Sequence, residues 1–369
     1  MGFDAVFDPH NWAVVPFHFW SLVFFSFGCV VGSFLNVCIY RMPLDLSVVS
    51  PPSHCPHCKY SIPFYLNVPL LTWLSLRGKC KNCRAPISPR YFIVELLTGL
   101  VFLACWLAFG HASPWIAAVY CLFLAGLITA TFIDFEHFII PDEITLGGAA
   151  VGFVISFFLP QLHGTNFLRV AVERSALGIA VGAGIVYAVL RLGKLLFGRQ
   201  KIKLPEGAKV IFTETALCLL DKEIPYEEIF YRKTDTIILE AQTVELIDRS
   251  YRAVTLRLTP EMLKLGDENF NPAAEPHMEV VCSEIILPRE AMGLGDVKFM
   301  AAIGAFIGWQ GAFFSLLASS LIGSAAGIAL ILLRKREWSS RMPYGPYIAL
   351  AAVIWIFGGK KLFDLLFQM

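Results

Sequence analysis

Two aspartates at the edges of long apolar stretches are the residues of this chain with the clearest chemical potential. Asp134 lies in the run TATFIDFEHFIIPDE, and Asp296 lies in AMGLGDVKFMAAIGAFIGW. A carboxylate next to hydrocarbon costs about 2.5–3.5 kcal/mol on insertion scales, so it usually serves a function. The alternative is that each carboxyl marks a helix end and reaches the membrane interface. Asp296 follows Gly293 and Gly295, where a helix can begin and a second backbone can approach closely.

If Asp134 and Asp296 meet, they form an acid–base pair. Two carboxyls a few ångströms apart do not both ionise easily, so one keeps its proton while the other is charged. The charged group can activate a water, and the protonated group can polarise the carbonyl of an amide. Such a pair hydrolyses a peptide bond without a metal or a nucleophilic side chain.

Neighbouring charged residues compete for this role. Asp142 and Glu143 follow Pro141, and together with Glu136 they are better explained as solvated residues near helix ends. Lys298 either tunes a neighbouring carboxyl or binds a substrate carboxylate, or it reaches the membrane interface.

A cysteine cluster is the second chemical signal. The segment 41–90 contains two C-x-x-C pairs, Cys55 with Cys58 and Cys80 with Cys83. This spacing predicts a closed four-thiolate zinc site that fixes the shape of the loop. Two disulfides are the alternative, and His54 or His57 could replace a thiolate ligand. Thiols stay reduced in the cytoplasm, where the charge pattern places this loop.

The composition indicates a polytopic membrane protein. Hydrophobic residues make up 56% of the 369 residues and charged residues 16%, against about 45–50% apolar residues in soluble domains. The apolar windows of spanning length are 14–40, 91–109, 114–133, 144–160, 170–197, 298–333 and 343–359. The window 298–333 is too long for one crossing and contains Gly304, Gly308 and Gly311, so we expect two helices there. The expected fold is an all-α membrane protein of about eight transmembrane helices.

Basic residues set the expected orientation. Seven of them lie in 41–90 against the single acid Asp45, which places this segment in the cytoplasm. The turns at 110–114 and 160–169 carry almost no positive charge, so we place them on the side of the membrane opposite the cytoplasm. Eight crossings then place both termini on that side as well. Lys360 and Lys361 do not fit this pattern. Two further groups mark the cytoplasmic side: Arg191, Lys194, Arg199, Lys201 and Lys203, and Arg334, Lys335, Arg336 and Arg341. The first residues are acidic, so no cleavable signal peptide is expected.

A soluble segment interrupts the membrane part. Residues 206–290 hold 17 acidic and 9 basic residues and contain short alternating runs, which predicts a β-rich cytoplasmic insertion. It contains no motif that indicates a chemistry, so a regulatory or assembly role, recruitment of substrate and a tolerated insertion are all compatible with it. The predicted domains are 14–109 with the zinc loop 41–90, 114–198, the insertion 206–290, and 291–359. No basic stripe interleaved with aromatic residues suggests nucleic-acid binding.

Several motifs appear in an order that resembles the bacterial type IV prepilin peptidases, also called leader peptidase/N-methyltransferases. The resemblance covers nearly the whole chain except 200–290. The motifs are Gly32-Ser33-Phe34-Leu35-Asn36-Val37, Tyr40-Arg41-Met42-Pro43, the two cysteine pairs, Arg77-Gly78-Lys79-Cys80, Ile87-Ser88-Pro89-Arg90-Tyr91, Val94-Glu95-Leu96-Leu97-Thr98, Asp134 with Ile140-Pro141-Asp142, Gly293-Leu294-Gly295-Asp296-Val297-Lys298, and Pro343-Tyr344-Gly345-Pro346-Tyr347.

The resemblance implies an inner-membrane aspartic protease that removes the basic leader of type IV prepilins or type II pseudopilins after a glycine. It further implies methylation of the new N-terminal residue with S-adenosylmethionine as donor, by the region 32–95. The catalytic pair then falls on Asp134 and Asp296 at the cytoplasmic side. No residue is assigned to S-adenosylmethionine, and prepilins and membrane lipid are the implied partners.

Three alternatives remain at this point. A proton-coupled transporter also keeps carboxyls in the membrane, but it has no use for a zinc loop. A zinc-containing membrane scaffold would be insensitive to Asp134→Asn and Asp296→Asn. Within the enzyme class, the alternative is a peptidase without methyl transfer.

Overall fold

The structure is a computed structural model that describes residues 16–63, 66–205, 207–219, 222–230, 233, 235–288, 293–333 and 342–367. The chain forms two compact units, residues 1–187 with 294–369 and residues 188–293. The acidic N-terminal residues and the basic residues Arg334, Lys335, Arg336 and Arg341 lie outside the described residues.

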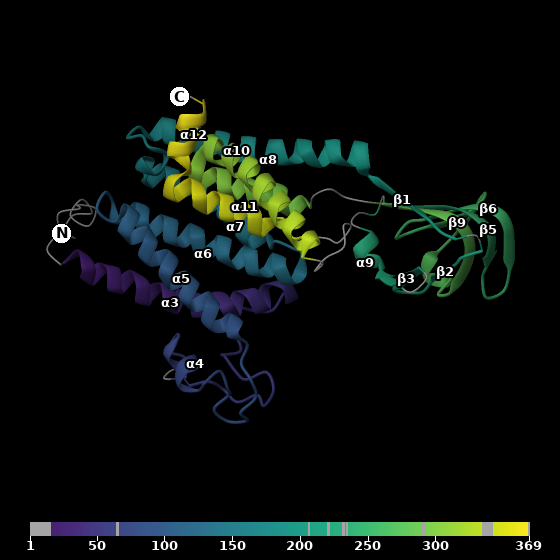
Figure 1. Cartoon of the computed structure of the whole chain (residues 1–369), viewed down its shortest axis with the longest axis horizontal. Coiled ribbons are helices and arrows are strands. Elements are labelled where there is room, and N and C mark those ends of the chain that lie inside the picture. Colours follow the sequence, from purple (N-terminus) through teal and green to yellow (C-terminus); the bar gives the residue numbers. More distant parts are fainter. Residues whose placement is uncertain are drawn as a thin grey trace. The chain divides into compact units, whose positions relative to one another are not determined.

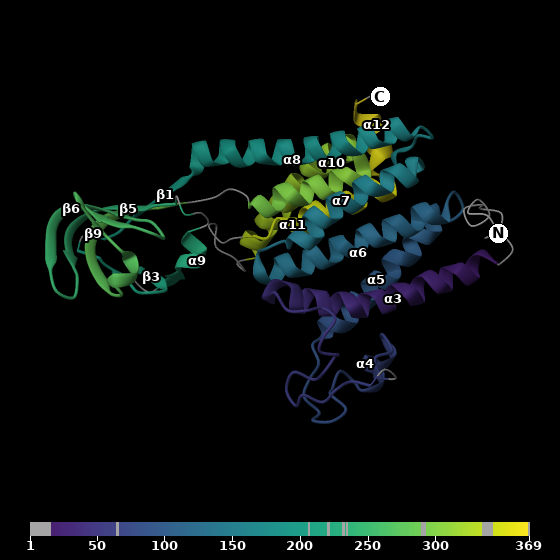
Figure 2. The same cartoon turned by 180° about the vertical axis from the view of Figure 1, so that it is seen from behind.

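Long helices build the first unit and run side by side (Figures 1 and 2). In chain order they are α3 (Phe17–Arg41), α5 (Pro89–Phe109), α6 (Pro114–His137), α7 (Asp142–Phe158), α8 (Leu168–Phe197), α10 (Leu294–Leu332), α11 (Gly345–Ile354) and α12 (Lys360–Phe367), with a π-helix (Trp355–Gly359) between the last two. Among the described residues, five helices are long and apolar enough to cross a membrane: α3, α5, α6, α8 and α10. The prediction of a mostly helical, multi-pass membrane protein is therefore confirmed.

The helix α10 consists of two helical pieces. Gly308 interrupts it with φ 73° and ψ 178°, a conformation that favours glycine. In the first piece, Gly295 faces Ile140, which in turn faces Gly345 at the start of α11. In the second piece, Gly323 faces Tyr344 and Tyr347, the neighbours of Gly345. Both pieces thus reach the start of α11, so the chain reverses at Gly308, in agreement with the two helices predicted for 298–333.

Small residues let α8 and the first piece of α10 touch backbone to backbone. A Cβ atom on Gly178 would lie 2.0 Å from the carbonyl oxygen of Gly304, and the reverse distance is also 2.0 Å. The Ser175 hydroxyl donates a 2.9 Å hydrogen bond to the carbonyl of Ala305. In lipid the hydrophobic effect does not drive helices together, so helix association depends largely on close packing through small residues. This contact fixes the piece of α10 that carries Asp296.

The second unit is built around an antiparallel sheet, as predicted for the insertion. Its strands pair in the order β4-β3-β2-β9-β5-β6-β7-β8, and β1 pairs with β9. The strands are β1 (Arg199–Lys203), β2 (Lys209–Phe212), β3 (Ala216–Leu219), β4 (Lys222–Pro225), β5 (Ile237–Glu245), β6 (Ser250–Leu258), β7 (Leu263–Leu265), β8 (Glu268–Phe270) and β9 (Met278–Pro288), with the short helix α9 (Tyr226–Ile229) after β4. Side chains alternate between core and solvent, so that Leu239 and Leu256 face each other in one buried cluster.

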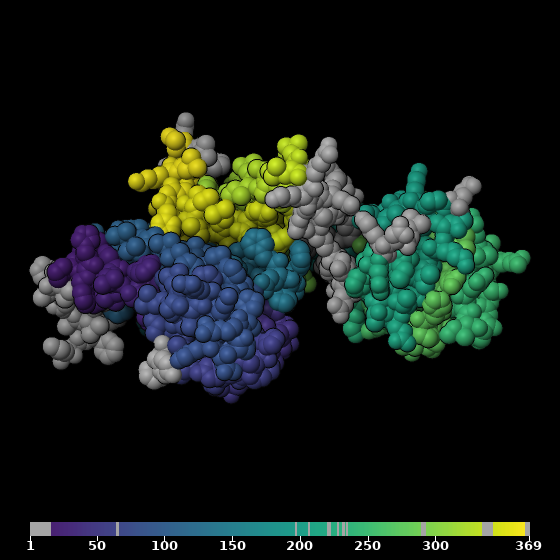
Figure 3. Space-filling view, turned by 60° about the horizontal axis from the view of Figure 1, so that its bottom comes forward, coloured from purple at the N-terminus to yellow at the C-terminus, as the bar shows by residue number. Residues whose placement is uncertain are grey.

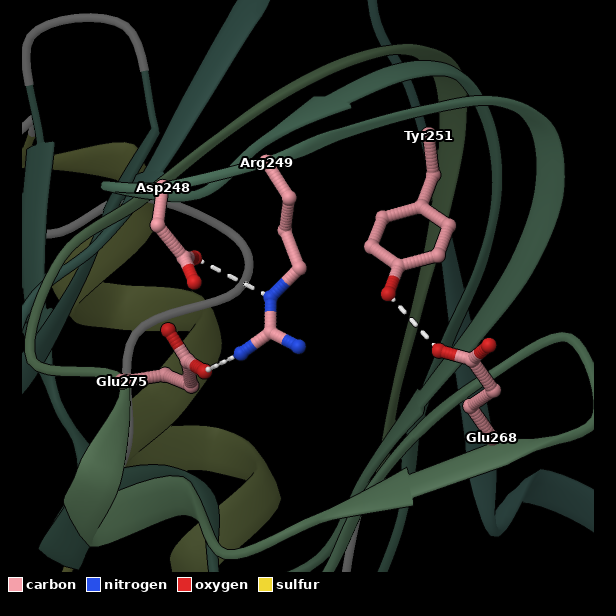
Figure 4. A network of polar contacts seen from close by, with 5 residues as sticks. All are labelled: Asp248, Arg249, Tyr251, Glu268 and Glu275. Atoms are coloured by element: carbon pink, nitrogen blue, oxygen red, sulfur yellow. Dashed lines mark hydrogen bonds and ion pairs between the residues drawn. The ribbon is translucent and has the colours of Figure 1, made fainter.

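A polar network closes the turn between β5 and β6 (Figure 4). The Arg249 guanidinium donates to Asp248 at 3.0 Å and to Glu275 at 2.9 Å. Nearby, the Tyr251 hydroxyl donates to Glu268 at 2.7 Å, and this bond raises the pKa of Tyr251. These exposed pairs tie the turn to the segment before β9, although each exposed ion pair contributes little to stability.

Candidate active site and metal centre

Asp134 and Asp296 occupy helix ends of the first unit and are both buried. Asp134 lies in the last turn of α6, where Phe138 ends the helix in a left-handed conformation and donates its N–H to the Asp134 carbonyl at 3.1 Å. Asp296 lies in the first turn of α10. Their exposed fractions are 5% and 9%. Their charges act on each other electrostatically, so the tertiary structure brings the two predicted carboxyls into one neighbourhood.

Gly345 supplies a backbone donor to this neighbourhood. Its N–H donates a buried 2.9 Å hydrogen bond to Oδ2 of Asp134. A Cβ atom at position 345 would lie 2.7 Å from the same oxygen, closer than real Cβ contacts allow. The donor also belongs to the first turn of α11, whose N-terminus favours negative charge. Gly345 therefore orients Asp134 and stabilises a charge on it.

Ile140 packs between the elements that carry the two carboxyls. It is 8% exposed, and its side chain lies 3.1 Å from the Cβ position of Gly345 and 3.7 Å from that of Gly295. On the outer side, the Lys298 ammonium binds both carboxylate oxygens of Asp142, at 2.7 and 2.9 Å. This ion pair links the starts of α7 and α10. It also gives Lys298 a partner that the sequence did not identify.

The competing acids are exposed, in contrast to the aspartate pair. Asp142 and Glu143 lie in the first turn of α7, as predicted for helix-start residues. Glu136 forms an ion pair with Arg90 from the first turn of α5. Only Asp134 and Asp296, among the described acids of this region, combine burial with mutual proximity.

The four predicted cysteines form a cluster that could hold a metal ion. The sulfurs of Cys55, Cys58, Cys80 and Cys83 all lie within 4.8 Å of one another, with 3.9 Å between Cys55 and Cys83 and between Cys58 and Cys80. Four thiolates at ~2.3 Å from a tetrahedral ion lie about 3.8 Å apart. All four cysteines are free thiols, which contradicts the disulfide alternative. In Figure 3 the loop that carries them faces the viewer in blue.

The two cysteine pairs sit in matching turns. In one, the Cys55 N–H binds the Tyr60 carbonyl and the Lys59 N–H binds the Cys55 carbonyl; Cys80, Ala85 and Arg84 repeat the pattern. Lys59 and Arg84 both have left-handed φ, of 58° and 61°. The two turns therefore present their sulfurs in the same way, as a closed tetrahedral site requires.

Hydrogen-bond donors and neighbouring sulfurs shift the thiol pKa values of this cluster in opposite directions. The Tyr60 N–H and then the Asn82 amide lower the pKa of Cys58 to about 6. At Cys83, the Ala85 N–H acts in the same direction, but burial and the neighbouring sulfurs outweigh it and raise the pKa to about 11. Four thiols this close resist ionising together, and a divalent cation would relieve that repulsion.

Two family profiles match this chain. Residues 26–109 match the profile described as Bacterial Peptidase A24 N-terminal domain, and residues 121–204 and 275–328 match that of the Type IV leader peptidase family. A prepilin leader peptidase/N-methyltransferase of Dichelobacter nodosus is 33% identical over 201 residues, 47% of this chain and 67% of that protein. The chain belongs to the type IV leader peptidase family.

Other members of the type IV leader peptidase family extend the similarity along the chain. A prepilin leader peptidase/N-methyltransferase of Aeromonas hydrophila is 28% identical over 376 residues, covering 94% of this chain and 93% of that protein. One of Myxococcus xanthus is 40% identical over 196 residues, 48% of this chain and 57% of that protein. No solved structure matches the chain.

The family match places each site in a different segment. The cysteine cluster lies within 26–109, whereas Asp134 and Asp296 lie in the two parts of the peptidase match. Gly345 lies beyond these matched ranges, and no role for its amide was predicted. The sequence signal was the motif Pro343-Tyr344-Gly345-Pro346, in which the glycine precedes Pro346, a residue that favours the first turn of a helix.

Proposed function

We propose that this chain cleaves the leader of type IV prepilins or pseudopilins at the cytoplasmic face of the inner membrane and methylates the new N-terminus. The observation that carries the peptidase step is the pair of buried carboxyls on α6 and α10, with the Gly345 amide on one of them. Relatives named prepilin leader peptidase/N-methyltransferase support the substrate and the second activity.

The peptidase step uses the pair as base and acid. The ionised carboxyl removes a proton from water, whose oxygen attacks the scissile carbonyl, while the protonated carboxyl donates to the carbonyl oxygen. When the intermediate collapses, the C–N bond breaks, the leaving amine takes the proton that the first carboxyl had removed from water, and the second carboxyl regains its proton from a hydroxyl of the intermediate. The Gly345 N–H and the start of α11 favour the charge on Asp134, which makes Asp134 the base in this proposal. Asp296 then donates the proton.

Methyl transfer belongs to the N-terminal part of the first unit. When bound there, S-adenosylmethionine would supply an electrophilic methyl group to the free amine of the cleaved pilin, with the C–S bond electrons remaining on sulfur and the amine losing a proton. The cysteine cluster is proposed to hold one structural zinc ion, with Lys59, Lys79, Lys81 and Arg84 offsetting the charge of four thiolates. The zinc ion would keep the loop 41–90 in one shape.

We also infer eight membrane crossings, with the cysteine loop and the insertion in the cytoplasm. The reversal at Gly308 supports two crossings within α10. The helix α7 is 17 residues long and apolar after its first turn, and α11 with its π-helical continuation adds a further short crossing. Labelling of single cysteines introduced at positions 46 and 165 with a membrane-impermeant maleimide tests this inference. We expect position 165 to react in intact cells and position 46 to react only after permeabilisation.

The decisive experiment follows the two activities separately in purified protein. A prepilin is incubated with labelled S-adenosylmethionine; mass spectrometry detects leader removal and the label detects methylation. Cleavage with methylation supports the proposal. Cleavage without methylation would limit the proposed function to that of a peptidase. If neither reaction is detected, the transporter or the scaffold becomes the better interpretation.

A further inference from the structure

The hydroxyl of Tyr344 is held by two adjacent serines of α10. Its oxygen lies 3.0 Å from Oγ of Ser319 and 2.9 Å from Oγ of Ser320. Both serines follow the break at Gly308, and each also lies 2.9 Å from the carbonyl oxygen of Leu316 one turn earlier. Tyr344 itself is the residue directly before α11. The three hydroxyls therefore join the start of α11 to the second piece of α10.

The protons of these hydroxyls are sufficient to satisfy the buried serine. Each hydroxyl carries one proton and can also accept a hydrogen bond. In one arrangement Ser320 donates to Tyr344 and Tyr344 donates to Ser319, which in turn donates to a carbonyl of its own helix. Ser319 is 0% exposed, so without the tyrosine its oxygen would lose this donor. A satisfied buried network of this kind holds its members in fixed positions.

The ring of Tyr344 rests on the same helix. A Cβ atom on Gly323 would lie 3.8 Å from the Tyr344 ring and 3.4 Å from the Tyr347 ring. Gly323 follows Ser319 and Ser320 by four and three positions, so all three lie on one face of the second piece of α10. Figures 1 and 2 show α11 beside α10. Hydroxyl bonds and ring contacts together leave the tyrosine little freedom to turn.

The peptide group between Tyr344 and Gly345 carries this restraint to Asp134. Its carbonyl accepts the first hydrogen bonds of α11, from the N–H groups of Tyr347 and Ile348 at 3.1 and 3.2 Å. Its N–H donates to Oδ2 of Asp134 at 2.9 Å. A peptide group is planar, so the direction of the N–H is set once its carbonyl and the preceding side chain are held. The second piece of α10 thereby orients the donor on one carboxyl, while the first piece carries the other carboxyl.

We propose that Tyr344 is a positioning residue for leader cleavage, which aims the carboxylate of Asp134 through the Gly345 amide. This inference rests on the peptidase activity proposed above and assigns no contact between the tyrosine and the substrate. The bonds to the two serines argue against such a contact, because they hold the phenol oxygen against α10. Aiming of the base acts on turnover rather than on capture of the substrate, so its loss should lower kcat and leave KM unchanged.

Removal of one hydroxyl tests the proposal. Tyr344→Phe removes the oxygen and keeps the ring on Gly323. Tyr347→Phe is the matched control, because its ring rests on the same glycine while its hydroxyl forms no hydrogen bond within the described part of the chain. Cleavage of a prepilin by each purified full-length variant gives kcat and KM. Methylation of a pilin that is already cleaved reports whether the protein remains folded.

We expect Tyr344→Phe to lower kcat about tenfold, as a small displacement of a catalytic group does, with KM and methylation unchanged. Tyr347→Phe should cleave as the wild type does. The double variant Ser319→Ala with Ser320→Ala should lower kcat by the same factor, and adding Tyr344→Phe to it should lower kcat no further, because the three hydroxyls act as one unit. Ser324→Ala is the control for the serines, since its hydroxyl donates only to the carbonyl of Ser320 in its own helix.

Other outcomes would overturn the proposal. Wild-type kcat in Tyr344→Phe would show that the hydroxyl does not position the base. Losses that multiply in the triple variant would assign the phenol a direct role, and a raised KM would assign it to substrate binding. If Tyr344→Phe loses methylation together with cleavage, the serine double variant decides, and wild-type kcat there overturns the proposal. Failure of the wild type to cleave any prepilin would overturn the proposed peptidase activity as well.

Discussion

The backbone amide of Gly345 donates a 2.9 Å hydrogen bond to the carboxylate of Asp134, 211 positions earlier in the chain. The bond joins the start of α11 to the end of α6 and leaves no room for a side chain at position 345. A donor on one oxygen of a buried carboxylate fixes its rotamer and directs its other oxygen toward a neighbour. The position of the proposed base is therefore set by a residue that has no side chain.

Replacement of Gly345 tests this relationship. In Gly345→Ala the Cβ atom would lie 2.7 Å from Oδ2 of Asp134, so the carboxylate or the helix must move. A displacement of this kind in a catalytic group lowers kcat by about 10–100-fold. The control is Gly147→Ala in α7, where an added Cβ meets nothing within 4 Å. Leader cleavage by each purified variant is the measurement, and wild-type kcat in Gly345→Ala would remove this glycine from the site.

The carboxyl pair itself gives a stronger prediction. Asp134→Asn and Asp296→Asn each remove one half of the acid–base pair, and we expect leader cleavage to fall by at least 10²–10⁴-fold. Methylation of a pilin that is already cleaved should persist in both variants. Glu143→Gln, at an exposed acid in the first turn of α7, should cleave at the wild-type rate. Near wild-type cleavage in either aspartate variant would exclude that residue from the mechanism.

The cysteine cluster predicts the metal content. Purified protein should contain about one zinc ion per chain, and serine at Cys55, Cys58, Cys80 or Cys83 should release it because a closed site needs four ligands. Methylation should decline before cleavage does, since the loop belongs to the N-terminal part of the unit. Elemental analysis is the measurement, with Cys218→Ser as a control outside the cluster. Active protein without zinc would contradict this prediction.

The insertion offers a prediction about substrate capture. Residues 206–290 carry a net charge of −8 (9 basic minus 17 acidic residues), opposite to the basic leader of a prepilin. Opposite charges raise encounter rates, and salt weakens the effect. If the insertion recruits leaders, replacing 206–288 with a short Gly/Ser linker should raise KM several-fold with little change in kcat and flatten the salt dependence. An unchanged KM at low salt would indicate a merely tolerated insertion.

Local patterns in the sequence determined much of this protein. Hydrophobic composition alone predicted a helical membrane protein, because repeated apolar stretches of about 20 residues match the thickness of a bilayer and would be unstable if exposed to water. Alternation of apolar and polar residues predicted the strands that became β5 and β6. The C-x-x-C spacing predicted the cysteine cluster, since each pair forms its own short turn and needs only one loop closure to meet the other.

Tertiary structure decided the contacts between distant segments. The sequence offered Gly304, Gly308 and Gly311 as breaks in the long apolar stretch, and packing selected Gly308. The long strand β9 closes the insertion by pairing with β1, β2 and β5, an order that no local pattern encodes. The Gly345 amide and the partners of Lys298 and Tyr344 were likewise invisible in the sequence. Backbone donors are the same at every residue except proline, so only the packing of whole helices decides which of them reaches a buried carboxylate.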